Sequence, residues 1–145
     1  MKSFLVTWQF WALAAACFAA LTAIFAKIGI AGVGSDFATL IRSIVILGVV
    51  TTLVLATGQW QPLASVPQRT WVFLVLSGMA TGLSWLCYFR ALKIGDAARV
   101  APLDKLSVVL VAVFAALFLG EKLSGPNWLG IAMIAAGAVL VSLKA

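Results

Sequence analysis

Histidine is absent from the 145-residue sequence, and only two cysteines and four acidic residues are present. Metal sites in proteins use clusters of these residue types at characteristic spacings, and none of them clusters in that way here. The sequence also lacks a Walker loop for nucleotide phosphates and any pairing of a nucleophile with a base. We therefore expect no metal site, no cofactor, no use of ATP and no enzymatic activity.

Charged residues are also scarce, at 10% of the chain, whereas roughly a quarter of the residues in soluble proteins are charged. Hydrophobic residues make up 64%, and the mean hydropathy is +1.16. A helix needs about 18 or more apolar residues to cross a hydrocarbon core roughly 30 Å thick. Five stretches reach this length: 5–29, 36–57, 70–94, 102–119 and 126–143. The sequence predicts an all-α integral membrane protein of five transmembrane helices, with a single domain over 1–145.

The first apolar stretch starts like a signal peptide, with a basic residue followed by small residues before Cys17. It continues to Ile30, however, which is longer than the apolar core of a signal peptide. We therefore expect it to remain as the first span. Cys17 and Cys87 fall in different predicted helices, so two buried, reduced thiols are expected rather than a disulfide.

The net charge of +6 does not indicate a nucleic-acid partner, because the ten basic residues form neither a run nor a basic face. They mark helix ends, as residues that set membrane orientation do. With five spans, one side of the membrane carries Lys2, Arg69 and Lys122. The other side carries Lys27, Arg42, Arg90, Lys93, Arg99, Lys105 and Lys144. By the positive-inside rule, the N-terminus is expected outside and the C-terminus in the cytoplasm, in a bacterial-type inner membrane.

Some of these charges are expected inside the spans. Asp104 follows Pro102 in a first helical turn, where the helix dipole favours an acid, and Lys93 can extend its amine to the interface. Arg42 is different, because it lies about 10 Å into its helix from an N-terminus that disfavours a cation. Charges within spans usually face a partner or a water-filled cavity. We therefore expect Arg42 to point inward, with a functional or charge-pairing role.

A polar stripe is predicted on the helix over 70–94. Ser77, Thr81, Ser84 and Tyr88 recur at spacings of four, three and four residues, and Trp85 lies beside them. Such a stripe can line the pathway of a small molecule. It can equally provide hydrogen bonds between helices, as Ser and Thr commonly do in membranes.

The acidic residues limit the class of substrate. All four lie near the ends of the predicted spans, whereas a proton-coupled exporter of organic cations needs a carboxylate near the middle of the membrane. The inward cations favour a zwitterionic or anionic substrate, with a carboxylate or phosphate group. The candidate substrate-binding residues are Arg42, Ser77, Thr81, Ser84, Trp85, Tyr88, Asp104 and Lys105.

The stretch "ALKIGDAARVAPLDKLSVVLVAVFAALFLGEKLSGPNWLGIAMIAAGAVLV", residues 91–141, resembles the second half of an EamA-type domain of the drug/metabolite transporter superfamily. The shared marks are "AL…G", "A..VAPL", "LGE" and "LG…AAG" in this order, together with "FAKIG" at 25–29 and Arg42. The resemblance implies a secondary transporter, often an exporter of amino acids or other metabolites. It also implies that the chain is half of a ten-helix fold built from two inverted five-helix units.

The chain departs from that family pattern in carrying one unit, so a dimer is expected. The partner is either a second copy or an oppositely oriented paralogue. Helices in lipid associate through small residues that let backbones approach closely. The helix over 126–143 has such residues and no internal charge, so its candidate interface residues are Gly130, Ala132, Met133 and Gly137.

These features predict an exporter of a small metabolite that works by alternating access as a dimer. Its partners would be the substrate, membrane lipid and a second subunit. Two alternatives remain open: a non-transporting membrane subunit or assembly partner, and a subunit of a lipid-carrier flippase, since the superfamily includes such relatives.

Overall fold

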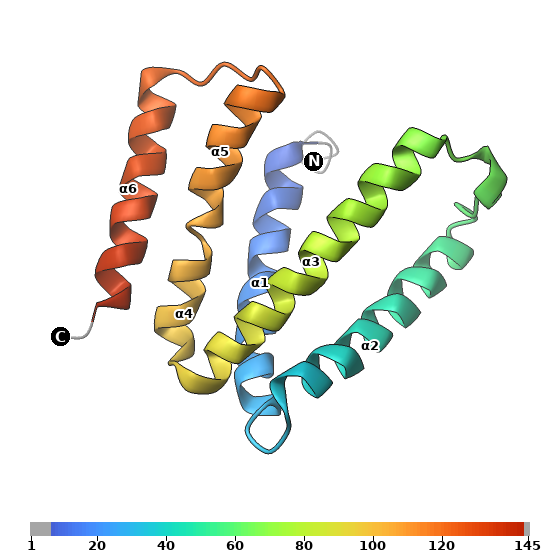
Figure 1. Ribbon diagram of the computed structural model, residues 1–145, viewed down its shortest axis with the longest axis horizontal. Coiled ribbons are helices and arrows are strands. Elements are labelled where there is room, and N and C mark those ends of the chain that lie inside the picture. Colours follow the sequence, from blue (N-terminus) through green and yellow to red (C-terminus); the bar gives the residue numbers. More distant parts are fainter. Residues whose placement is uncertain (1–6, 144–145) are drawn as a thin grey trace. The chain divides into compact units, whose positions relative to one another are not determined.

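The computed structural model describes residues 7–143, which are helical apart from their connections; that range contains no strand (Figure 1). Lys2 and Lys144, the first residues of the predicted first span and the two termini lie outside the described residues. A short 3₁₀ turn at Leu63–Ser65 lies in the connection between the second and third helices. The helices are α1 (Trp8–Gly29), α2 (Ser35–Ala56), α3 (Gln68–Ile94), α4 (Ala97–Asp104), α5 (Ser107–Phe118) and α6 (Gly125–Ser142).

Five helical segments within residues 7–143 are long and apolar enough to cross a membrane, which confirms the prediction of five spans. α1, α2, α3 and α6 are each one span, and the fourth span runs over Ala97–Leu119. Very few of the residues in these spans are buried in the chain itself. Large apolar side chains such as Leu47, Leu74 and Leu117 are instead exposed, as expected for helices that contact lipid.

The fourth span differs from the sequence prediction at its start. The expected helix began at Pro102, with residues 96–101 in a turn, but α4 begins at Ala97. Asp96 precedes it in an extended conformation, and its carbonyl accepts bonds from the amides of Arg99 and Val100. Asp is a favoured residue type at this position, but the Asp96 side chain makes no capping hydrogen bond within the described residues, and the helix start is held by these backbone bonds. Pro102 therefore lies inside α4, where it removes one backbone donor without ending the helix.

The same span is interrupted between α4 and α5. The amides of Lys105 and Leu106 bond to the carbonyls three residues earlier, at 3.0 and 3.1 Å. This is the tighter pattern of a 3₁₀ turn, which often marks a local change within a helix. The interruption follows Pro102 by one turn.

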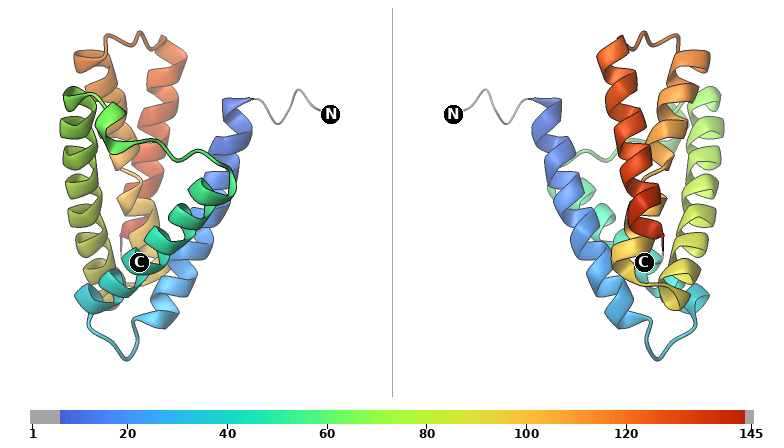
Figure 2. Two further views of the ribbon diagram at one scale, coloured as in Figure 1. Left: turned by 90° about the vertical axis from the view of Figure 1, so that its right-hand side faces the viewer. Right: turned by 90° about the vertical axis from the view of Figure 1, so that its left-hand side faces the viewer.

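One compact unit contains residues 7–27 and 94–143 of the described chain, with α1, α4, α5 and α6. α6 runs antiparallel to α4 and α5 and packs along them (Figures 1 and 2). Small residues are buried in this unit, namely Ala23, Ala26, Ala112, Ala115 and Ala138. Two basic side chains reach chain carbonyls: Lys27 Nζ lies 2.8 Å from the carbonyl oxygen of Gly95, and Arg99 Nη2 lies 2.9 Å from that of Ser142.

The second unit contains residues 28–93, with α2 and α3. The start of α2 and the end of α3 lie close together, and the two helices diverge toward the connection that joins them (Figures 1 and 2). We call the end where the start of α2 meets the end of α3 the closed end. The buried residues of this unit lie near it: Ile30, Thr39, Phe89 and Leu92. The divergence leaves a groove between the helices.

Cys17 and Cys87 are free thiols, but both are exposed rather than buried as the sequence predicted. The reason is that so little of each span is covered by protein. A thiol is a small, apolar group, so it is as compatible with lipid as with a protein interior.

Gly58 ends α2 in a left-handed conformation, with φ of 65°. Its amide bonds to the carbonyl of Leu55, and the amide of Gln59 bonds to that of Val54, which together form a Schellman motif. We expect Gly58→Ala to destabilise the protein by about 1–2 kcal/mol, since an L-residue disfavours this conformation. Gly48→Ala, in the interior of the same helix, is the control: its site is open, and the change should leave stability equal or slightly higher. Thermal unfolding in detergent, followed by circular dichroism, should show a lower melting temperature for Gly58→Ala and an equal or higher one for Gly48→Ala. A similar decrease in both variants would contradict this account.

Candidate functional site on helices α2 and α3

Arg42 of α2 lies against two aromatic rings of α3. Its guanidinium carbon is 4.4 Å from the ring centre of Phe89 and 5.4 Å from that of Trp85. Both distances are within the range of cation–π attraction. Its Nη1 atom is buried, and no hydrogen-bond partner for it lies among the residues that the structure describes. Arg42 is therefore a cation inside a membrane span that is held by rings and not by a carboxylate.

The local sequence explains how the two rings meet one cation. Trp85 and Phe89 are four residues apart, so they lie one above the other on the same face of α3. Trp85 was among the predicted site residues, whereas Phe89 was not. The spacing from Trp85 was the available signal, but it gave no reason to prefer Phe89 over other apolar neighbours.

An ion pair between Asp36 of α2 and Arg90 of α3 joins the two helices at the closed end of the second unit. Nε of Arg90 donates to Oδ1 of Asp36 at 3.0 Å, and Nη2 donates to Oδ2 at 2.7 Å. Such two-bond pairing fixes geometry as well as charge. Lys93, one turn further along α3, donates from Nζ to the carbonyl oxygen of Val33 at 2.7 Å. Asp36 is therefore paired with Arg90, and not with Arg42.

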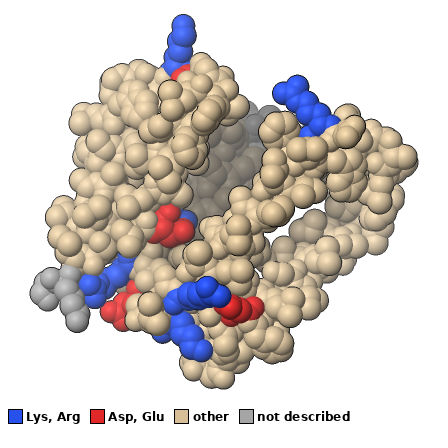
Figure 3. All heavy atoms as spheres, in the orientation of Figure 1, with Lys and Arg blue, Asp and Glu red and all other residues tan. Residues whose placement is uncertain are grey.

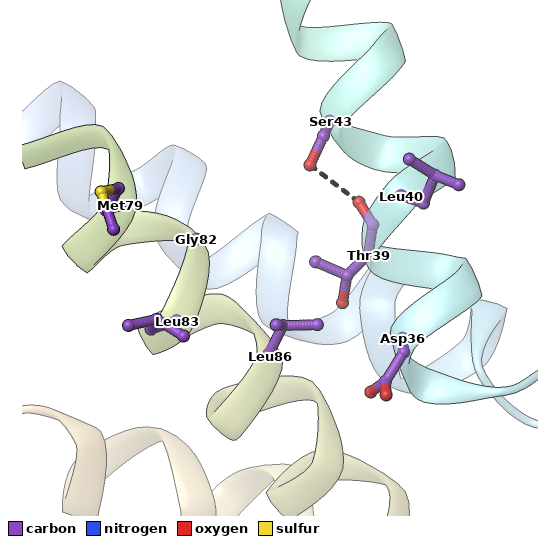
Figure 4. Close-up of a pocket in the computed structure, with 8 residues that line it drawn as sticks. All are labelled: Asp36, Thr39, Leu40, Ser43, Met79, Gly82, Leu83 and Leu86. Carbon is purple, nitrogen blue, oxygen red and sulfur yellow. Dashed lines mark hydrogen bonds between the residues drawn. The ribbon is translucent and has the colours of Figure 1, made fainter. Parts of the chain in front are cut away.

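A groove of about 430 Å³ lies between α2 and α3 (Figure 4). We call it the α2–α3 groove. Its α2 side carries polar residues in addition to one leucine, and its α3 side is apolar. The lining residues are Asp36, Thr39, Leu40, Ser43, Met79, Gly82, Leu83 and Leu86.

The predicted hydroxyl stripe of α3 lies apart from this groove, since none of its members is among the lining residues. Ser77, Thr81 and Ser84 are exposed, while Trp85 and Tyr88 are half-buried. The hydroxyl of Thr81 donates to the carbonyl of Ser77 at 2.9 Å, within α3 itself. Trp85, which lies beside the hydroxyl stripe, contacts the Arg42 guanidinium.

Asp104 and Lys105 belong to the other unit, at the interruption between α4 and α5. Lys105 Nζ lies 3.1 Å from Oδ2 of Asp104, so these neighbours pair with each other. Charges such as these occupy little of the protein surface. In the face shown in Figure 3, the charged atoms form small groups on a surface that is otherwise uncharged.

The candidate interface residues all lie on the exposed surface of α6: Gly130, Ala132, Met133 and Gly137. A Cβ atom added at Gly130 or Gly137 would meet no atom of the described chain within 4 Å. These glycines are therefore not used for close packing within the described residues.

Five apolar spans, with an arginine held between aromatic rings inside one of them, define a multi-pass α-helical membrane protein. The chain belongs to the EamA-like transporter family, which it matches over residues 6–143. This agrees with the family resemblance seen in the sequence.

Similar proteins include a transporter and a flippase subunit. An uncharacterized transporter encoded in the cobO 3′ region of a Sinorhizobium species is 68% identical over 137 residues, 94% of this chain and 97% of that protein. An uncharacterized protein of Methanocaldococcus jannaschii is 26% identical over 122 residues, 78% of this chain and 88% of that protein. The probable 4-amino-4-deoxy-L-arabinose-phosphoundecaprenol flippase subunit ArnE of Yersinia pestis is 34% identical over 82 residues, 57% of this chain and 72% of that protein. No solved structure matches the chain.

Proposed function

We propose that this protein is a secondary transporter that exports a small zwitterionic or anionic metabolite, such as an amino acid, and that it works by alternating access as a dimer. The observation that carries the proposal is Arg42, a cation within a span, with a buried Nη1 atom that has no hydrogen-bond partner among the described residues. Membership of the EamA-like transporter family supports the transport class.

The environment of Arg42 favours an anionic group as its ligand. A charge within a span is costly unless it is paired or faces water. The rings of Trp85 and Phe89 attract the guanidinium but accept none of its conventional hydrogen bonds. A carboxylate or phosphate would supply both the opposite charge and the missing acceptor. Arg42 would then bind the charged group of the substrate, with Trp85 as its positioning neighbour; Ser77, Thr81, Ser84, Tyr88, Asp104 and Lys105 remain candidate pathway residues.

The number of spans within the described residues supports the proposed dimer. Transporters of inverted-repeat type alternate access by rocking one repeat against the other around a site between them. One five-helix unit over residues 1–145 would provide half of such a ten-helix assembly. A second copy or an oppositely oriented paralogue would provide the other half. The exposed glycines of α6 support a contact there, since they are free of close packing within the described chain.

A second candidate function is that of a subunit in a lipid-carrier flippase. The specific observation in its favour is the similarity to ArnE, which is named as a probable flippase subunit. In that case the chain would act only together with another membrane protein.

Purified protein in proteoliposomes tests both functions. We expect the protein alone to move a labelled anionic or zwitterionic metabolite down an imposed gradient. A screen of amino acids, other carboxylates and phosphate esters would identify the class. Movement of such a compound only after a second membrane protein is added would favour a transporter formed with a paralogue. Failure of every such compound to move, with movement of a labelled phosphorylated lipid carrier once a second subunit is present, would favour the flippase-subunit function and rule out the metabolite transporter.

The proposed orientation places the N-terminus outside and the C-terminus in the cytoplasm of a bacterial-type inner membrane. It rests on the unequal distribution of basic residues. A reporter enzyme that is active only in the cytoplasm is expected to be active when fused after Ala145. A reporter that is active only outside the cytoplasm is expected to be inactive there. Equal labelling of a C-terminal tag from both sides of the membrane would contradict a single orientation and indicate dual insertion.

A further inference from the structure

The α2–α3 groove has a charged residue at one end. Elsewhere its surface can make apolar contacts. Thr39, at its base, is 6% exposed, and its hydroxyl donates to the carbonyl of Ser35 at 2.9 Å. The hydroxyl of Ser43 donates to the carbonyl of Thr39 at the same distance (Figure 4). These hydroxyl donors are therefore satisfied by the helix itself. Leu83 and Met79, by contrast, expose most of their apolar surface.

The remaining hydrogen-bonding capacity of the groove is concentrated at Asp36. Its side chain is 54% exposed and that of Arg90 is 63% exposed. Oδ1 of Asp36 accepts bonds from Nε of Arg90 and from the hydroxyl of Ser35, the latter at 3.2 Å. Oδ2 accepts one bond, from Nη2 of Arg90, and keeps a free lone pair, while the guanidinium keeps further N–H donors. The end of the groove therefore presents an anionic acceptor beside a cationic donor, and a ligand can bind both without breaking the ion pair.

The dimensions of the groove correspond to one leaflet of a bilayer. Asp36 and Ser43 are seven residues apart on α2, a rise of about 10 Å. Half of a hydrocarbon core of roughly 30 Å is about 15 Å. Asp36 lies in the first turn of α2 and Arg90 in the last turns of α3, at helix ends where lipid head groups are found. The groove thus runs from head-group level through most of the depth of one leaflet.

We propose that the α2–α3 groove binds a phospholipid with a zwitterionic head group. One acyl chain lies along Leu40, Leu83 and Leu86, the phosphate accepts hydrogen bonds from Arg90, and the ammonium group donates to Asp36. A head group with a phosphate and no ammonium would place its negative charge beside the exposed Asp36 carboxylate, and the two anions would have to share the Arg90 guanidinium. Charge complementarity therefore selects the zwitterionic lipid. This site is separate from the metabolite contact at Arg42, so the proposal does not rest on the proposed function.

The test uses full-length protein in proteoliposomes that contain phosphatidylethanolamine with a photoactivatable diazirine in its acyl chain. Parallel vesicles contain phosphatidylglycerol with the same chain. Mass spectrometry after illumination locates the labelled residues. We expect labelling at the groove residues, in favour of phosphatidylethanolamine by about threefold, as for a partly exposed charge pair. Equal labelling by both lipids, or labelling spread over all helices, would overturn the proposal. This comparison needs no substitution.

A pair of glycine substitutions on α3 provides the matched control. Gly82 lines the groove, Gly78 does not, and an added Cβ meets no atom within 4 Å at either position. Gly82→Leu would fill the groove and is expected to lower labelling by about tenfold, whereas Gly78→Leu should retain it. Asp36→Asn should remove the preference for phosphatidylethanolamine. Arg42→Ala should leave labelling unchanged. Unchanged labelling in Gly82→Leu would contradict the proposal, even if transport were lost.

Discussion

Arg42→Ala is expected to lower the flux of an anionic or zwitterionic substrate by about 100-fold, since removing one member of a buried charge pair typically costs 2–5 kcal/mol and each ~1.4 kcal/mol is tenfold. In the substrate-bound protein, the truncation would leave a carboxylate or phosphate beside Trp85 and Phe89 with no cation to neutralise it. Initial rates in proteoliposomes, compared at equal amounts of inserted protein, measure the effect.

Lys93→Ala is the matched control on the other helix of the same unit. Lys93 is exposed, and its amine bonds to the backbone carbonyl of Val33, so we expect only a few-fold decrease in flux. Arg42→Lys adds a further test, because a lysine keeps the charge but lacks the planar group that stacks on rings and binds carboxylates in two-bond geometry. It should restore part of the flux. Wild-type rates in both alanine variants would refute the role of Arg42, and loss of folded protein in Arg42→Ala alone would assign it to structure.

Gly130→Leu combined with Gly137→Leu is expected to convert the proposed dimer to a monomer in detergent and to abolish the proposed transport. The two glycines lie seven residues apart, on nearly one face of α6, with Met133 exposed between them. Association in lipid depends on close approach of backbones, because there is no hydrophobic force between helices there. Two leucine side chains would hold the helices apart. Light scattering in detergent measures the change in mass.

A second pair of glycines controls for the substitution itself. Gly48 and Gly78 lie on α2 and α3, and the space around each is open in the same way. Gly48→Leu with Gly78→Leu should leave the dimer intact. A dimer that persists in the α6 variant, or that dissociates only in the control, would remove α6 from the interface.

The five spans were predictable because the length of an apolar run is a property of the sequence alone. The interruption of the fourth span was not predictable, since it depends on which of two possible helix starts the backbone adopts. Pro102 suggested a helix start, but α4 begins after Asp96, a residue type favoured at the capping position, which lies six positions before Pro102. A proline within a helix and one at its beginning give similar patterns, and only the backbone geometry decides between them.

The contacts of Arg42 could be predicted only in part, for a related reason. The depth of Arg42 in its helix, whose N-terminus disfavours a cation, indicated an inward cation. The structure places its guanidinium against Trp85 and Phe89. The partner of Asp36 could not be derived, because pairing across 54 residues depends on how helices cross. The hydroxyl spacing of α3 also had two interpretations, a substrate pathway and hydrogen bonds between helices. The Thr81 hydroxyl instead bonds within its own helix, an interaction that spacing does not reveal.

Within residues 7–143, basic side chains bond to backbone carbonyls at or near helix ends: Lys27 to Gly95, Lys93 to Val33 and Arg99 to Ser142. Gly95 and Ser142 lie at the C-terminal ends of α3 and α6, where carbonyls lack partners within the helix, and Val33 lies in the connection that precedes α2. These bonds therefore satisfy backbone carbonyls as well as place charge. An engineer who wished to reverse insertion by neutralising these residues would loosen the ends of the spans at the same time. Adding lysines to the connections over 57–67 and 119–124 would change the charge balance and leave the carbonyls satisfied. In the proposed orientation, these three side chains thus contribute both to the charge balance across the membrane and to the bonding of the backbone.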